Sequence, residues 1–256
     1  MPNDKISIKA LLLDIDGVIK QKGKIIPNIS DHLKRVIDNG ILVKFVTNCS
    51  LYKLYKFSEK ILPGYKVEII DPLDVLKDLI SKNPSLINHQ SIILGTKDIK
   101  KRISELGIKL SDNKKVDSVF IFEKLRYNQD EITQASRAVL NGAKLYCAGI
   151  DQLFWFKGEA YPGVGAITEQ IKFMTRANAF VLGKPSERIF ELAMYPDIKP
   201  NQTAFVGDEF HIDILGAKKC GLTTVYLTTN SLANKPYYSN KVILEPNLKS
   251  FVRNFL

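Results

Sequence analysis

Continuous hydrophobic runs that end abruptly in polar residues recur along this chain. The first run, Leu11–Leu13, continues into Asp14, Ile15, Asp16 and Gly17. A run of this kind predicts a buried parallel strand that carries its polar end to the carboxyl edge of a sheet, where open α/β folds place their ligands. An Asp-x-Asp-Gly sequence also suits a turn. Taken alone, the stretch leaves a functional site and a polar turn equally open.

The next segments predict a βαβ unit. Apolar residues at helical spacing indicate a helix that Ser30 can cap and Gly40 ends. The apolar run 41–46 follows and ends in Thr47 and Asn48. For a strand, a helix and a strand in this order, the right-handed parallel crossover is the default connection.

Between residues 71 and about 177 the alternation of strands and helices starts again. Strands are predicted at 91–94, 116–122 and 144–148, with helical patterns between them. Periodicity alone permits either a continuation of one long sheet or a separate inserted domain. The aromatic run 153–156 favours a buried core or a subunit contact over a substrate pocket.

Two more hydrophobic runs near the C-terminal end finish in polar residues. The run 180–182 leads to Lys184, and the run 203–206 leads to Asp208, with Asp213 five residues later. If these strands share one parallel sheet with the earlier ones, all the polar ends face the same crevice.

Composition and charge narrow the function classes. At 256 residues, with 45% hydrophobic and 25% charged residues, the chain fits two domains or one domain with a large insertion. The three cysteines are far apart, so neither a disulfide framework nor a zinc site is indicated. We expect a soluble cytoplasmic protein without a membrane segment. The net charge of +10 comes from dispersed lysines, which favours a solvated surface first, an anionic substrate second and nucleic acid last.

The polar strand ends carry complementary chemistry. Carboxylates such as Asp14, Asp16 and Asp208 bind Mg²⁺, which commonly bridges to a phosphate, and a lysine and a threonine can hold the other phosphate oxygens. Each residue also has a simpler explanation: Lys184 as a solvated loop lysine, Thr47 with its neighbour as a helix cap, and the acids as turn or helix-start residues. Their joint occurrence favours phosphate chemistry.

Four segments in one order carry a family resemblance: Asp14–Val18, Phe45–Ser50, Gly183–Ser186, and Gly207–Asp208 followed by Asp213. They resemble the motifs of the haloacid dehalogenase (HAD) superfamily of phosphotransferases. The long insertion, with Tyr161–Ala166, resembles NagD-like and p-nitrophenyl phosphatases, which carry a large α/β cap. The resemblance implies an α/β fold with a doubly wound, Rossmann-like parallel-sheet core at 1–72 and 178–256 and an inserted α/β cap at 73–177.

The resemblance also implies a mechanism. Asp14 would be the nucleophile that forms an aspartyl-phosphate, and Asp16 the general acid and base. Mg²⁺ would be held by Asp14, the main-chain carbonyl of Asp16 and Asp208. Thr47, Asn48 and Lys184 would bind the transferring phosphoryl group.

Two departures from the family pattern weaken the remaining assignments. Relatives usually carry threonine at the position of Ile212, and isoleucine cannot donate a hydrogen bond. This difference weakens the assignment of Asp213 as the residue that orients Lys184 or a metal-bound water. Where many relatives have Asn-x-Asp on a substrate-facing cap loop, this chain has Gly149-Ile150-Asp151. Asp151 is therefore the only part of that loop that the resemblance carries over as a substrate contact.

These inferences predict Mg²⁺-dependent hydrolysis of small phosphorylated metabolites. The alternatives are a phosphotransferase or mutase of the same fold, and a non-catalytic module that binds phosphate or nucleic acid. Retention of both Asp14 and Asp16 argues against the module, because binding alone needs no acid/base pair. The resemblance also suggests a homodimer formed through the cap.

Overall fold

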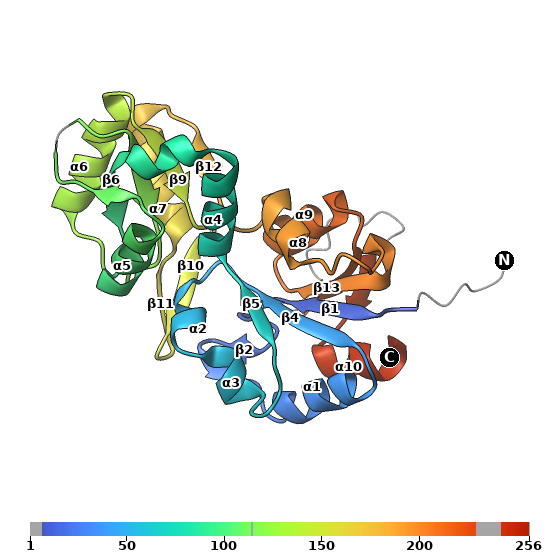
Figure 1. The fold of residues 1–256 in the computed structure, drawn as a ribbon. Coiled ribbons are helices and arrows are strands. Elements are labelled where there is room, and N and C mark those ends of the chain that lie inside the picture. The colour runs from blue at the N-terminus through green and yellow to red at the C-terminus, as the bar shows by residue number, and fades with distance from the viewer. Residues whose placement is uncertain (1–6, 114, 229–241, 256) are drawn as a thin grey trace. The chain divides into compact units, whose positions relative to one another are not determined.

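The computed structural model describes residues 7–113, 115–228 and 242–255. The chain divides into two compact units (Figure 1). The predicted domain boundaries stay a prediction. The first unit comprises Met1–Thr47, Lys56–Ile70 and Phe190–Leu256, and the second comprises Asn48–Tyr55 and Asp71–Ile189.

Six parallel strands of the described residues form the sheet of the first unit, in the order β15-β14-β13-β1-β4-β5. Strand β1 (Ala10–Leu13) is fully buried between β13 (Thr203–Gly207) and β4 (Leu42–Val46). A four-residue apolar run suits this position because helices cover both faces of a parallel sheet. The other strands are β5 (Glu68–Ile70), β14 (Thr223–Leu227) and β15 (Val242–Glu245).

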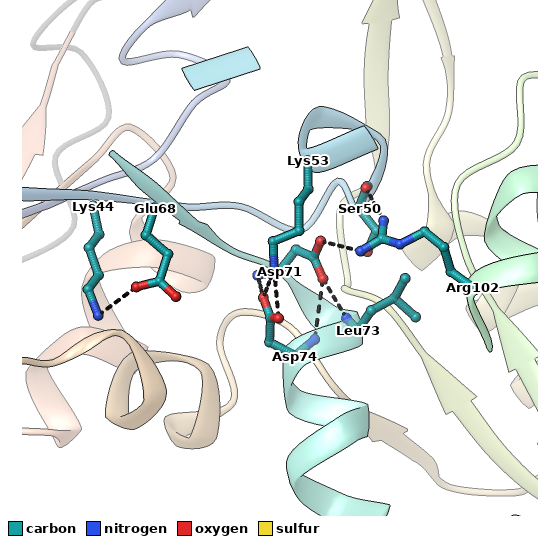
Figure 2. Close-up of polar contacts among 8 residues, drawn as sticks. All are labelled: Lys44, Ser50, Lys53, Glu68, Asp71, Leu73, Asp74 and Arg102. Carbon is teal, nitrogen blue, oxygen red and sulfur yellow. Dashed lines mark hydrogen bonds and ion pairs between the residues drawn. The ribbon is translucent and has the colours of Figure 1, made fainter. Parts of the chain in front are cut away.

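Lys44 is the polar residue that interrupts the apolar run of β4. Its Nζ lies 3.0 Å from Glu68 Oε2 on the neighbouring strand β5 and 4.4 Å from the centre of the Tyr195 ring. Figure 2 shows the ion pair. The amine therefore has an anionic and an aromatic neighbour at the sheet surface.

The helices of the first unit lie on both faces of its sheet: in Figure 1, α1 and α10 are on one face and α9 is on the other. Helix α1 begins at Ile29, one residue before the predicted cap Ser30, because Asn28 adopts the left-handed conformation and takes the N-cap position. Besides the sheet, this unit contains α1 (Ile29–Asp38), α3 (Phe57–Ile61), α9 (Leu215–Lys219), α10 (Leu248–Phe255), the turns η2 (Pro200–Gln202) and η3 (Phe210–Ile214), and the hairpin of β2 (Lys20–Gln21) and β3 (Lys24–Ile25).

The second unit has its own parallel sheet, in the order β12-β9-β8-β6-β7 among the described residues. Strand β12 (Ala179–Val181) pairs with β9 (Lys144–Cys147), and the Phe180 ring stacks on Tyr146 at 5.2 Å. The strand before Lys184 therefore does not belong to the same sheet as β1, and the prediction that all the polar strand ends face one crevice of a single sheet is wrong. A run of three apolar residues does not specify which strand it pairs with. The other strands are β6 (Gln90–Leu94), β7 (Lys109–Leu110) and β8 (Ser118–Ile121).

Side-chain caps define where several helices of the second unit begin. Asp71 caps α4, Thr96 caps α5 and Asn128 caps α6, each by accepting backbone N–H groups of the first turn. Within the part of the chain that the structure describes, no helix is both long and apolar enough to cross a membrane. The helical elements are α2 (Leu51–Leu54), α4 (Pro72–Lys82), η1 (Pro84–Asn88), α5 (Lys97–Glu105), α6 (Gln129–Leu140) and α7 (Val164–Thr175), followed along the chain by α8 (Glu187–Ala193).

The aromatic run forms a two-stranded hairpin outside that parallel sheet. Strand β10 (Leu153–Phe156) pairs antiparallel with β11 (Glu159–Pro162), and Phe154 stacks on Tyr161. Leu153, Trp155 and Phe156 are 48%, 37% and 42% exposed. The buried-core interpretation is wrong for these three side chains, because the two-stranded ribbon leaves much of their surface uncovered, and the subunit contact stays a prediction.

Candidate active site

Three carboxylates of the first unit lie close together after strands β1 and β13. Asp14 directly follows β1, Asp208 directly follows β13, and Asp213 lies in the turn η3. One oxygen of each carboxylate lies within 4.8 Å of the others. Asp14 and Asp213 are buried and Asp208 is half-buried. Several hard oxygen donors in one place fit a divalent cation such as Mg²⁺.

Backbone hydrogen bonds fix the loops that carry these carboxylates. The Asp14 N–H donates to the Val206 carbonyl at 3.0 Å, which ties the end of β1 to β13. Asp213 Oδ2 accepts hydrogen bonds from the N–H groups of Asp208 and Glu209, both at 3.1 Å. Asp213 therefore holds the backbone that carries Asp208, a contact that the sequence did not predict.

The loop after Asp14 needs glycine and leaves Asp16 open to solvent. Gly17 has φ +88°, and a Cβ there would lie 2.0 Å from the Asp208 carboxylate. The Asp16 side chain is 53% exposed and lies 3.6 Å from Lys20 Nζ. Access to solvent suits a carboxyl group that must both give and take protons.

The predicted phosphate-binding residues belong to different compact units. Thr47, in the first unit, is buried after β4, and its N–H donates to the Ile70 carbonyl at 3.0 Å. In the second unit, Asn48 Oδ1 accepts from the Lys184 N–H at 2.7 Å, and Asn48 Nδ2 donates to the Lys184 carbonyl at 3.2 Å. The same Nδ2 donates to Asp151 Oδ2 at 2.8 Å. The structure thus brings together Asn48, Lys184 and Asp151.

Gly183 allows this close approach of Asn48 to the chain before Lys184. A Cβ at Gly183 would lie 2.2 Å from both Asn48 Oδ1 and the Ala148 carbonyl oxygen. A larger residue would push the Asn48 amide away, so the glycine in the Gly-Lys-Pro-Ser segment has a packing reason.

Sequence reasoning missed a group of charged residues around Ser50. The Ser50 N–H donates to Glu123 Oε1, and Arg102 Nη1 donates to the Ser50 carbonyl, both at 2.6 Å. Arg102 also donates through Nη2 to Asp71 Oδ2 at 3.2 Å (Figure 2). One signal was present: Glu123 follows the apolar end, 119–122, of a predicted strand, as Asp14 follows its own run.

Burial changes the acidity of two of these carboxyl groups. Burial raises the pKa of Glu123 to about 8, and the carboxylates of Asp71 and Asp151 add to the rise. Burial also raises the pKa of Asp71, as does the neighbouring Asp74, while Lys53 and Arg102 oppose that rise. The second unit therefore contains carboxyl groups that bind protons more tightly than exposed ones.

Two segments of the chain match models of known protein families. Residues 11–109 match the family model of haloacid dehalogenase-like hydrolases, and residues 181–242 match a second model described as HAD-hydrolase-like. The first range includes Asp14, Asp16 and Thr47, and the second includes Lys184 and Asp208. The chain belongs to the haloacid dehalogenase-like hydrolases.

Individual HAD relatives share most of their length with this chain. An acid sugar phosphatase of Staphylococcus epidermidis is 24% identical and covers 86% of either chain. The ribonucleotide monophosphatase NagD of Escherichia coli K12 is also 24% identical, over 86% of this chain and 87% of its own. The crystal structure of a 4-nitrophenylphosphatase of Thermotoga maritima, at 17% identity, superposes with a TM-score of 0.79 over 98% of both chains.

These matches confirm three predictions made from the sequence. The chain is a NagD-like member of the HAD superfamily, its fold is an α/β fold with a parallel-sheet core, and its class is that of the HAD phosphatases. The roles of individual residues stay predictions.

Proposed function

We propose that this HAD phosphatase is an Mg²⁺-dependent phosphomonoester hydrolase that acts through a covalent aspartyl-phosphate. The observation that carries the proposal is the group of Asp14, Asp208 and Asp213: one oxygen of each carboxylate lies within 4.8 Å of the others, and all three residues lie in segments that match the HAD models. Three acids this close repel one another unless a cation or protons compensate them. When bound, Mg²⁺ would offset the negative charge that otherwise repels a phosphate dianion.

Asp14 is the proposed nucleophile. Its Oδ1 accepts a hydrogen bond from the Ile15 N–H at 2.7 Å, which helps to orient the carboxylate. A carboxylate oxygen of Asp14 attacks phosphorus, and the bond from phosphorus to the leaving oxygen breaks. The product of this step is the phosphorylated Asp14 side chain.

Asp16 is the proposed proton carrier for both halves of the reaction. In the first half its carboxyl group gives a proton to the leaving oxygen. In the second half its carboxylate takes a proton from the water that attacks phosphorus, which releases inorganic phosphate and restores Asp14. The exposure of the Asp16 side chain supports this assignment, since the proton must exchange with solvent.

Thr47, Asn48 and Lys184 are the proposed ligands of the transferring phosphoryl group. A hydroxyl, a backbone N–H and an ammonium group complement the oxygens of that group. The side-chain amide of Asn48 is taken up by Lys184 and Asp151, so the backbone N–H of Asn48 is the group we assign to phosphate. Asp151 thereby has a contact within the protein besides its proposed role toward substrate.

Small phosphorylated metabolites are the proposed substrates. The relatives carry different names, acid sugar phosphatase and ribonucleotide monophosphatase, so these names do not select one substrate for this chain. A panel of sugar phosphates and nucleotides would identify the preferred leaving group. Adding an alcohol acceptor to the same assay distinguishes hydrolysis from phosphotransfer, because a transferase forms a new phosphate ester.

The nucleophile assignment is tested with p-nitrophenyl phosphate. We expect purified protein to hydrolyse it with Mg²⁺, to lose activity in EDTA and to regain it when Mg²⁺ is restored. The Asp14→Asn variant should lose at least about 10³-fold in kcat, since removal of a nucleophile removes the covalent route. Asp31→Asn, at an exposed position of α1, is the matched control and should behave like the wild type. A folded Asp14→Asn protein with substantial turnover would refute the assignment.

A further inference from the structure

Both backbone polar groups of Ser50 are held by polar side chains from the inserted part of the second unit. Glu123, just after β8, accepts from the Ser50 N–H, and Arg102, on α5, donates to the Ser50 carbonyl, each at 2.6 Å. Figure 2 shows the Arg102 guanidinium reaching toward both Ser50 and Asp71. The hydrogen bond from the Arg102 guanidinium is charge-assisted and therefore stronger than one between neutral groups, and the Glu123 carboxyl group adds a second short hydrogen bond on the opposite side of Ser50.

The residues that hold Ser50 are themselves anchored. Asp71 is fully buried and uses both oxygens: Oδ2 accepts from Arg102, and Oδ1 accepts from the N–H groups of Leu73 and Asp74 at the start of α4. The guanidinium is planar and rigid, so it can engage Asp71 with one nitrogen and the Ser50 carbonyl with the other. The position of Ser50 is therefore tied to the first turn of a capped helix.

The residue two positions earlier is held in a similar way. Asn48 makes side-chain hydrogen bonds to the Lys184 backbone and to Asp151. Residues from four separate stretches of the second unit, Arg102, Glu123, Asp151 and Lys184, thus hold Asn48 and Ser50 by direct hydrogen bonds. A surface loop without a positional requirement does not need four long-range partners.

We propose that Arg102 and Glu123 are positioning residues for phosphate binding: by holding the backbone of Ser50 they keep the N–H of Asn48 aimed at the phosphoryl group. The inference rests on the proposed function in one respect, the assignment of Asn48 to phosphate. Neither residue touches the phosphoryl group in this proposal. Oriented backbone N–H groups act through their geometry, and a displacement of about 1 Å can cost as much as about 100-fold in rate.

The first experiment measures the binding of inorganic phosphate by calorimetry in the presence of Mg²⁺. Arg102→Gln, which cannot bridge Ser50 and Asp71, should raise the Kd for phosphate about tenfold or more. Arg102→Lys keeps the charge beside Asp71 but has a single nitrogen, so it should fold and give an intermediate Kd. Arg137→Gln, at an exposed position of α6, is the matched control and should leave the Kd unchanged.

The second experiment compares a variant that keeps the hydrogen-bond acceptor of residue 123 with a variant that removes it. Glu123→Gln retains an oxygen that can accept from the Ser50 N–H, whereas Glu123→Ala does not. We expect Glu123→Gln to bind phosphate within about threefold of the wild type and Glu123→Ala to bind it about tenfold more weakly, with p-nitrophenyl phosphate kcat/KM falling in parallel. A role in folding alone would change the unfolding midpoint without changing the phosphate Kd of the folded protein.

The outcomes distinguish this inference from the proposed function. If Arg102→Gln and Glu123→Ala are folded and bind phosphate like the wild type, the positioning role is wrong even if the enzyme is an active phosphatase. If the wild type shows no turnover but these variants weaken phosphate binding, the positioning role stands and the proposed hydrolysis fails. If kcat/KM falls only in proportion to the lost folded fraction, both residues are merely structural.

Discussion

At the scale of single residues, Glu123 makes the stability of the second unit depend on pH. Its Oε2 is buried and has no hydrogen-bond partner among the residues that the structure describes, and burial raises its pKa to about 8, against about 4.3 in an unfolded chain. The folded state then binds a proton that the unfolded state releases. The proton on Glu123 therefore adds to the free energy of unfolding. This contribution is present in full below about pH 4.3 and decreases as the pH rises toward 8. Above that value the contribution is gone and the free energy of unfolding no longer changes with the ionisation of Glu123.

Replacing Glu123 with glutamine should remove this pH dependence. Between about pH 4.5 and 8 we expect Glu123→Gln to gain stability over the wild type by up to about 1.4 kcal/mol per pH unit, with a plateau at higher pH. Urea denaturation of both proteins at several pH values measures the difference. Glu105→Gln, at an exposed position of α5, should follow the wild type. Parallel curves for Glu123→Gln and wild type would show that Glu123 ionises as an exposed glutamate does.

At the scale of elements, the strands and their polar ends could be predicted because a buried parallel strand is apolar throughout. The runs before Asp14, Thr47 and Asp208 became β1, β4 and β13 of one sheet. Pairing partners could not be predicted, since hydrogen bonds between backbones carry no sequence signal, and the strand before Lys184 pairs in the other sheet.

Contacts between residues that are distant in the sequence could not be predicted from the sequence either. Arg102 lies on the polar face of a predicted helix, where an arginine is ordinarily solvated, and only the fold reveals its bonds to Ser50 and Asp71. The aromatic hairpin shows the opposite error, because hydrophobicity predicted burial for side chains that the fold leaves exposed, such as Phe156. Residue type thus located the candidate chemistry but not the groups that hold it in place.

Helix α6 offers a test of how local sequence defines an element. Asn128 Oδ1 accepts from the Glu131 N–H at 2.7 Å, and Glu131 in turn accepts from the Asn128 N–H and from Lys124. Asn128→Ala should therefore lower the free energy of unfolding by about 1 kcal/mol. Asn141→Ala, at the exposed C-terminal end of the same helix, should change it by less than about 0.5 kcal/mol. Equal effects in chemical denaturation would show that the capping box contributes nothing.

At the scale of the whole molecule, the net charge of +10 acts on every anionic substrate. The lysines are dispersed, so their summed field is broad and screened by salt: the Debye length falls from about 30 Å at 0.01 M to about 8 Å at 0.15 M ionic strength. We expect kcat/KM for p-nitrophenyl phosphate to fall about 2- to 10-fold over this range while kcat stays constant, because the field aids encounter and not chemistry. Replacing NaCl with choline chloride controls for specific effects of the cation. If kcat/KM does not change with salt, the dispersed lysines take no part in substrate capture, and the attraction comes from groups close to the bound phosphate, for which Lys184 is the proposed cation.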